Sequence, residues 1–375
     1  MIILIFLNYT NCFCQFINST KIVKIQIHLL IALFFFSISA SLKAQEANSN
    51  VQKTTKLFRE TEPLSISMRY SNRDLLKETD DSTFLKTKLA YLIQDDQWDS
   101  LTVRLRARGN WRRNNCFLAP VKMEIQKKQS KNTLFDGNEE LKLVLPCRNT
   151  DDGSDYIIKE FLAYKLYELL TPYHFKTRML NIDYSDVKKS KDKPYQLLGF
   201  IIEDIREVAK RNGGKNLKKT VHPTQQDDYT TIQNDLFQFL IGNTDFSTTY
   251  QHNEKMMLVE GKKAIPVPYD FDMSGFVDAN YAVVSQVRGE QLNITDVKER
   301  IYRGFRRDTE VFEKVRQDYL AKKDAFLAAI DATEEEFINA KNFVHIRSYL
   351  LEFYDILEDD ERFKNLILDK ARPMN

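Results

Sequence analysis

One segment in the second half of the chain constrains the fold more than any other. Apolar residues at 236–241 end a helical pattern, and a polar loop at 242–253 follows them. Residues 256–267 then predict a β-hairpin with Glu260 and Gly261 at its turn. The acidic residues Asp270 and Asp272 come directly after the hairpin. This order predicts that side chains from the loop and from the end of the hairpin form one site.

The polar side chains of this segment favour phosphoryl-transfer chemistry. Asp245 can orient or deprotonate an attacking hydroxyl. The amide oxygen of Asn253 and the carboxylates of Asp270 and Asp272 suit Mg²⁺, a hard cation that bridges phosphate oxygens. Each residue also has a plainer explanation, because Asp245 is a common turn residue and Asp270 or Asp272 can cap a helix. The order of Asp245, Asn253 and the acidic pair after the hairpin favours a phosphoryl-transfer site over these plainer explanations.

Length and composition fit a globular protein. The 375 residues suffice for one large domain or two modest ones, and 43% of them are hydrophobic. The net charge of +2 gives no reason to predict a nucleic-acid partner. Strand patterns dominate the first half and helical patterns the second, with residues 208–230 expected to be an exposed linker. We therefore predict a β-rich domain at 63–205 and a mainly helical domain at 206–375. Further helices are expected at residues 297–305, 311–329, 334–340 and 344–368.

The N-terminus has the pattern of a secretory signal. Lys21 and Lys24 precede an apolar run at residues 29–38, and small residues lead to Ala44. Residues 1–44 therefore predict an N-terminal extension with a signal peptide, and export to the periplasm or the extracellular space. An uncleaved N-terminal membrane anchor is the alternative. Residues 45–62 are expected to be a flexible leader, and no transmembrane span is expected in the mature chain.

Two cysteines remain after the predicted cleavage. Cys116 and Cys147 are an even pair, each in or beside a predicted strand region. In an exported protein such a pair is consistent with a disulfide. Two free buried thiols are the alternative.

Basic residues of the first half supply candidate phosphate ligands. Lys142 lies on a predicted strand just before a helix that contains Glu160, so an ion pair could orient its ammonium group. Lys122 is the second candidate for this role. Arg108 belongs to a dense basic group beside a glycine turn, which suits an anionic phosphate. A solvated strand face and a charged loop explain the same residues without a ligand.

Several motifs resemble known kinase families. Residues 240–245 resemble the catalytic loop of the HipA-type kinases, and the Arg-Gly-Asn run at 108–110 with the late Pro-Tyr-Asp-Phe-Asp resembles the spore-coat CotH-type kinases. The chain is also similar to a group of secreted bacterial proteins of unassigned activity that carry the same segments. The resemblance covers about residues 100–310. It departs from the HipA pattern because Asn253 stands eight residues after Asp245, where that family has a step of five.

The resemblance implies an α+β, two-lobed protein kinase-like fold, with a β-rich N-terminal lobe and a mainly helical C-terminal lobe. It implies Asp245 as the catalytic residue, Asn253, Asp270 and Asp272 as metal ligands, and Glu203 near the sugar of a nucleotide. The expected activity is ATP- and Mg²⁺-dependent transfer of a phosphoryl group to a protein or small-molecule hydroxyl. The alternative is an inactive exported pseudokinase that acts as a ligand-binding module.

Overall fold

The computed structural model describes residues 54–188, 191–285, 289 and 291–374, and Lys53–Asn375 form one compact unit. The predicted signal peptide lies outside the described residues. The strands are β1 (Leu64–Tyr70), β2 (Leu85–Gln94), β3 (Gln97–Ala107), β4 (Val121–Ile125), β5 (Glu140–Val144), β6 (Thr177–Asp186), β7 (Lys193–Ile202), β8 (Gly214–Leu217), β9 (Glu254–Val259) and β10 (Ala264–Pro268).

Helices precede, connect and follow these strands. The α-helices are α2 (Lys56–Arg59), α3 (Asn72–Glu78), α4 (Asn110–Asn115), α5 (Lys127–Ser130), α6 (Asp151–Leu170), α7 (Ile205–Arg211), α8 (Asp228–Leu240), α9 (Thr309–Leu320), α10 (Lys323–Asp331), α11 (Ala340–Glu358) and α12 (Asp360–Phe363). Short 3₁₀ turns are η1 (Pro223–Gln225) and η3 (Glu334–Glu336), and a π-helical turn, η4 (Lys364–Leu368), follows α12.

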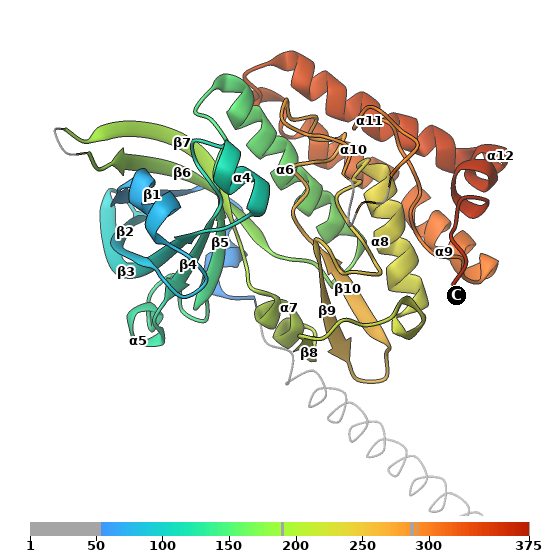
Figure 1. The fold of residues 1–375 in the computed structure, drawn as a ribbon, viewed down its shortest axis with the longest axis horizontal. Helices are drawn as coiled ribbons and strands as arrows, with labels where there is room; N and C mark the ends of the chain where they lie inside the picture. Colours follow the sequence, from blue (N-terminus) through green and yellow to red (C-terminus); the bar gives the residue numbers. More distant parts are fainter. Residues whose placement is uncertain (1–53, 189–190, 286–288, 290, 375) are drawn as a thin grey trace, which may run out of the picture. The chain divides into compact units, whose positions relative to one another are not determined.

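The first seven strands close into a barrel in the order β1-β2-β3-β4-β5-β7-β6 (Figure 1). All neighbours are antiparallel except β1 and β6, which pair in parallel from Leu64 opposite Leu180 to Tyr70 opposite Asp186. This parallel pair removes the two free edges that an open sheet would have. The alternate residues that point inward, such as Val103, Leu105 and Met123, are buried in one apolar core.

The predicted two-lobed, kinase-like α+β fold is therefore wrong. That prediction placed a β-rich lobe before a helical lobe, whereas the strands of the first half form a closed seven-stranded mixed barrel. Helix α6 also does not belong to the barrel core, because its apolar residues share a second core with α8, α9, α10 and α11. Sequence patterns report the inward face of each strand but not its partners, and the β1–β6 pairing joins segments more than 100 residues apart.

A three-stranded antiparallel sheet, in the order β10-β9-β8, lies beside the helices (Figure 1). The predicted hairpin at residues 256–267 corresponds to β9 and β10. Residues 208–230 were predicted to be an exposed linker, but they contain β8 and η1, and Val221 is buried with Met256 and Ala264. Backbone pairing of Leu217 with Met256 holds this segment in place.

Several predicted local structures differ from the observed ones. Residues 297–305 form no helix, and side chains of this segment bind distant carbonyls: Arg300 donates to Leu240 and Arg303 to Phe246, at 3.2 and 2.9 Å. The predicted helix at 311–329 is divided into α9 and α10, and that at 334–340 is only the turn η3. Leu57 and Phe58 of the predicted flexible leader are buried in the barrel core.

Cys116 and Cys147 form a disulfide. It joins the end of α4 to the loop after β5, and it resolves the two alternatives left by the sequence. None of the helices in the described part of the chain combines the length and apolar character needed to cross a bilayer.

Candidate functional site

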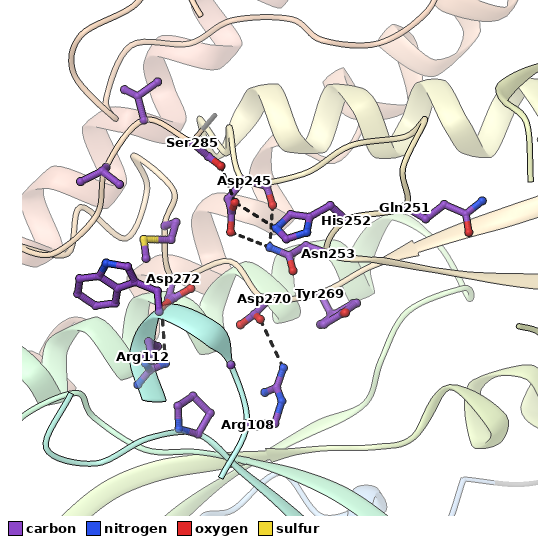
Figure 2. Close-up of a pocket in the computed structure, with 16 residues that line it drawn as sticks. Arg108, Arg112, Asp245, Gln251, His252, Asn253, Tyr269, Asp270, Asp272 and Ser285 are labelled. Atoms are coloured by element: carbon purple, nitrogen blue, oxygen red, sulfur yellow. Dashed lines mark hydrogen bonds and ion pairs between the residues drawn. The ribbon is translucent and has the colours of Figure 1, made fainter. Parts of the chain in front are cut away.

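A cavity of about 700 Å³ collects most of the predicted site residues. Its wall contains Asp245 and Asn253 from the polar loop, Asp270 and Asp272 from the segment after β10, and Arg108 from the end of β3 (Figure 2). These residues come from positions as far apart as 108 and 272 in the sequence. The remaining lining residues are Gly109, Trp111, Arg112, Pro120, Gln251, His252, Tyr269, Met273, Val283, Val284 and Ser285.

The loop between Asp245 and Asn253 folds back on itself. The backbone groups of Ser247 and His252 exchange two hydrogen bonds of 3.2 Å, so residues 248–251 form a turn that closes the eight-residue step. Asn253 therefore returns to Asp245, and its amide nitrogen Nδ2 donates to the Asp245 carbonyl at 2.7 Å and to carboxylate oxygen Oδ2 at 2.9 Å. The longer spacing does not separate the two side chains.

Three side chains fix the carboxylate of Asp245. Besides Asn253, the hydroxyl of Ser285 donates to Oδ1 at 2.7 Å, and His252 Nε2 lies 3.2 Å from the same oxygen (Figure 2). The hydrogen bond with Asp245 raises the pKa of His252, although partial burial opposes this effect. A carboxylate held by several partners has a defined orientation, which a positioned general base needs.

The start of the loop is anchored to the helical part of the molecule. Gly242 has a φ of +60°, and a side chain there would collide with the hydroxyl of Tyr349. Only glycine combines this left-handed conformation with so close a neighbour. The carbonyl of Ile241 accepts a hydrogen bond of 2.9 Å from the backbone of Phe276, which ties the loop to the segment after Asp272.

Asp270 adopts a left-handed backbone conformation, with a φ of +68°. Its backbone nitrogen donates to the hydroxyl of Tyr164 on α6 at 2.9 Å, and its carboxylate lies 3.4 Å from a guanidinium nitrogen of Arg108. Non-glycine residues adopt positive φ values mainly where surrounding contacts enforce them, and such positions are common at functional sites. In Figure 2, Asp270 lies between Asn253 and Arg108.

Asp272 belongs to a buried charge cluster in the wall of the cavity. Its carboxylate lies 3.6 Å from Arg112 and accepts a hydrogen bond of 3.3 Å from Tyr281. Burial, with repulsion from Asp270 and Asp245, raises the pKa of Asp272 to about 6, although Arg112 opposes the increase. Arg112 also faces Glu160 at 4.0 Å.

Glu160 does not form the predicted pair with Lys142. Its nearest cation is Arg112, and burial together with the charge of Asp272 raises the pKa of Glu160 well above its usual range. Within the described residues, Nζ of Lys142 has no hydrogen-bond partner and lies 3.7 Å from the centre of the Tyr269 ring. Burial and repulsion from Arg108 lower the pKa of Lys142 to about 7.

Lys142 instead lines a second, smaller pocket of about 280 Å³. Lys122 is also in this wall and forms ion pairs with Glu124 at 3.1 Å and Glu140 at 2.9 Å. Arg108 and Tyr269 line both spaces, so the second pocket adjoins the first cavity. Lys122 and Lys142 therefore line the smaller, basic pocket. They do not line the larger cavity that contains Asp270 and Asp272.

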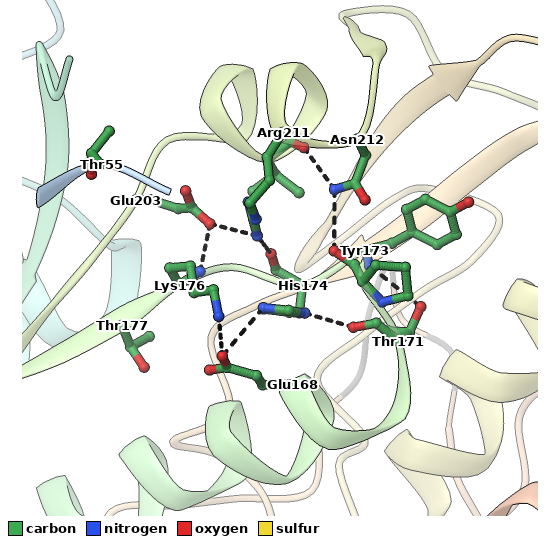
Figure 3. A network of polar contacts seen from close by, with 12 residues as sticks. Thr55, Glu168, Thr171, Tyr173, His174, Lys176, Thr177, Glu203, Arg211 and Asn212 are labelled. Atoms are coloured by element: carbon green, nitrogen blue, oxygen red, sulfur yellow. Dashed lines mark hydrogen bonds and ion pairs between the residues drawn. The ribbon is translucent and has the colours of Figure 1, made fainter. Parts of the chain in front are cut away.

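Glu160 lines neither of the two pockets, and the structure also places Glu203 away from the site. Glu203 lines neither of these two pockets, and its carboxylate accepts a 2.6 Å hydrogen bond from the backbone of Lys176 and pairs with Arg211 at 2.9 Å (Figure 3). This network joins the start of β6 to helix α7. Burial raises the pKa of Glu203 to about 7 despite its Arg211 partner. These contacts explain Glu203 as a structural residue.

Two residues of the site carried little signal in the sequence. Arg112 is in the basic group around Gly109, but its position between Asp272 and Glu160 depends on the packing of α4. Ser285 belongs to no motif, and it reaches Asp245 across 40 positions in the sequence. Only the tertiary structure identifies it.

The oxygen-bearing side chains fit a Mg²⁺ ion that is shared with a substrate. Two carboxylates, from Asp270 and Asp272, and the amide of Asn253 line one cavity. Among the described residues, no group of three or more His, Cys, Asp or Glu side chains is placed to hold a metal by itself. Protein Mg²⁺ sites commonly use one or two carboxylates and complete the shell with water and substrate phosphates. The donor set matches that pattern.

Comparisons with known proteins assign no family to this chain. No model of a protein family matches it, and no curated protein matches it significantly. The resemblance to CotH-type and HipA-type kinases therefore remains a hypothesis based on short motifs.

Proposed function

We propose that this protein transfers a phosphoryl group from a Mg²⁺-bound nucleoside triphosphate to a hydroxyl group of a protein or small molecule. The observation that carries the proposal is the convergence of Asp245, Asn253 and Asp270 on one cavity, with Arg108 at its wall. These groups supply a base, oxygen ligands for a cation and a positive charge for phosphate, which are the elements that phosphoryl transfer requires.

Each side chain has a distinct task in this proposal. Asp245 accepts the proton of the acceptor hydroxyl, whose oxygen forms a bond to the terminal phosphorus. The bond from that phosphorus to the bridging oxygen breaks, and its electron pair leaves on the shortened donor. Asn253, Asp270 and Asp272 would hold the Mg²⁺ ion, which would neutralise phosphate charge. Arg108 orients the phosphates through its guanidinium group.

Thermal unfolding with Mg²⁺ and ATP tests donor binding. Wild-type protein should be stabilised by the pair, whereas Asp270→Ala should lose this stabilisation because a metal ligand is missing. Asp183→Ala is a matched control, since Asp183 is an exposed carboxylate on β6 that lines neither cavity. No stabilisation of the wild type, or equal stabilisation of Asp270→Ala, contradicts the proposal.

One observation favours the second candidate, an inactive module that binds a ligand without transfer. The predicted Lys142–Glu160 pair is not formed, and Glu160 faces Arg112 instead. Labelled ATP distinguishes the two functions, because only an active enzyme moves the terminal phosphate to an acceptor or to water. Binding of Mg²⁺ and ATP without any label transfer would favour the binding module.

Export remains part of the proposal. Its basis is the N-terminal sequence pattern, and the Cys116–Cys147 disulfide is of the kind that persists in oxidising compartments. Fractionation of cells that produce the full chain, with detection of the protein outside the cytoplasm, tests this part.

A further inference from the structure

The second pocket has a different chemistry from the cavity it adjoins. Its wall contains five basic side chains, from the three neighbouring strands β3, β4 and β5, the segment after β3, and the hairpin. The acidic residues in the same wall are Glu140 and Asp204, and both are already paired with Arg206, at 2.8 and 2.6 Å. The basic residues are Arg106, Arg108, Lys122, Lys142 and Lys255.

Positive charge in this pocket is only partly compensated by the protein. Arg106 pairs with Asp81, and Lys122 pairs with Glu124 and Glu140. In contrast, Lys142 and Lys255 form no ion pair with any carboxylate of the described residues, and the buried Nζ of Lys142 also lacks a hydrogen bond there. A buried ammonium group without a hydrogen-bond or ion-pair partner is unfavourable, so an anion in the pocket would satisfy it.

The pocket offers little apolar surface for a nucleobase. Tyr269 and Leu141 are its apolar lining residues, and the Tyr269 ring lies 3.7 Å from Nζ of Lys142 and 5.4 Å from Nζ of Lys255. A base that stacked on Tyr269 would displace these ammonium groups. The volume of about 280 Å³ also falls below the range of roughly 300–1,000 Å³ that is usual for small-molecule sites.

We infer that the protein recognises the phosphoryl donor through its phosphate chain alone. The phosphates extend from Arg108 into the pocket at Lys142 and Lys255. A base-free triphosphate therefore serves as donor. This inference rests on the proposed function and names its donor class. With tripolyphosphate, the acceptor oxygen binds the terminal phosphorus, the hydroxyl proton moves to Asp245, and pyrophosphate leaves with the electron pair of the broken bond.

Affinity measurements with Mg²⁺ and four donors test the inference. Sodium tripolyphosphate, ATP, GTP and UTP are titrated by isothermal calorimetry against the wild-type chain. We expect all four dissociation constants to agree within about tenfold, because the base contributes little. If ATP binds more than about tenfold tighter than tripolyphosphate, the inference is overturned while the proposed function stands. If none of the four binds, both fail.

Substitution of the pocket lysine locates the binding. Lys142→Met should weaken tripolyphosphate and ATP alike, by roughly tenfold or more, because a charge-assisted hydrogen bond to phosphate is lost. Lys255→Met is a second variant for the same pocket. Lys88→Met is the matched control, since Lys88 is an exposed lysine of β2 outside both cavities. Unchanged affinity in both pocket variants, or an equal loss in Lys88→Met, overturns the inference.

Discussion

The two adjoining cavities differ in how their charges are balanced. In the larger cavity, Asp245 is held by Asn253, His252 and Ser285, and Asp272 faces Arg112. In the smaller pocket, Lys142 has no hydrogen-bond or ion-pair partner within the described residues. The larger cavity is thus organised by the protein itself, whereas the smaller pocket has charge that a ligand would have to neutralise.

This difference separates positioning from binding. Side chains that are fixed before a ligand arrives suit chemistry, because preorganised groups need no rearrangement at the moment of reaction. Uncompensated positive charge suits the capture of an anion. The comparison therefore predicts that substitutions in the larger cavity change the rate of transfer, while those in the smaller pocket change the affinity for the donor.

The largest effect is expected for Asp245→Asn. Loss of a general base typically lowers a rate by about 10²–10⁴-fold, and the donor affinity should stay within about twofold because the pocket lysines are untouched. Single-turnover transfer from labelled ATP, together with calorimetric binding, checks both parts. Asp183→Asn is the control. A large loss of affinity with an unchanged rate would reverse the assignment of the two cavities.

The Cys116–Cys147 disulfide is expected to have the next largest effect. It closes a loop of sequence separation 31, so the double Cys→Ala variant should lose roughly 3 kcal/mol of unfolding free energy. Helix α4 carries Arg112 and ends directly before Cys116, so the transfer rate should fall more than the affinity for tripolyphosphate. Urea unfolding measures the stability, and a parallel loss of rate and affinity would contradict the separation of the cavities.

Lys142→Met should stabilise the protein at neutral pH while it weakens donor binding. The pKa of Lys142 is lowered from 10.5 to about 7 in the folded chain, so the unfolded chain binds more protons between these values and wild-type stability rises as pH increases through this window. Removal of the amine should add on the order of 2 kcal/mol near pH 6–7, with the gain shrinking towards pH 10. Unfolding curves across this pH range, with Lys88→Met as control, test the sign.

The smallest effect on ligand binding is expected for Glu203→Gln. Its pKa is raised to about 7, so the wild type should lose stability as pH rises from about 4.5 through 7, and the variant should lack this decrease. The variant should bind tripolyphosphate within about twofold of wild type, since Glu203 lies outside both cavities. Calorimetry and urea unfolding at pH 5 and 8 measure these two quantities. A tenfold change in the affinity for tripolyphosphate would show that Glu203 contributes to donor binding.

Part of this architecture could be predicted from local sequence. The hairpin at residues 256–267 was expected, and β9 and β10 form it, because alternation of side chains is a short-range property. The fold class was not predictable in the same way. The kinase-like assignment relied on short motifs and on strand patterns that precede helical ones, and the same order of elements is compatible with a barrel once β1 pairs with β6.

The candidate site shows the same division. Asp245, Asn253, Asp270 and Asp272 stood out because their residue types and order suit one chemistry, and they do line a common cavity. The partner of Glu160 was mispredicted because α4 brings Arg112 to it. Ser285 was missed because its hydrogen bond to Asp245 depends on the path of a long loop.

By itself, the sequence determined many of the local elements, the residues available for chemistry and the glycine that lets the loop turn beside Tyr349. Only the tertiary structure decided the closure of the barrel, the return of Asn253 to Asp245 and the meeting of Arg108 with Asp270. The physical reason is the distance along the chain over which each kind of interaction acts. Periodicity and backbone conformation depend on near neighbours, whereas closure and the meeting of charges depend on packing between segments that are far apart in the chain.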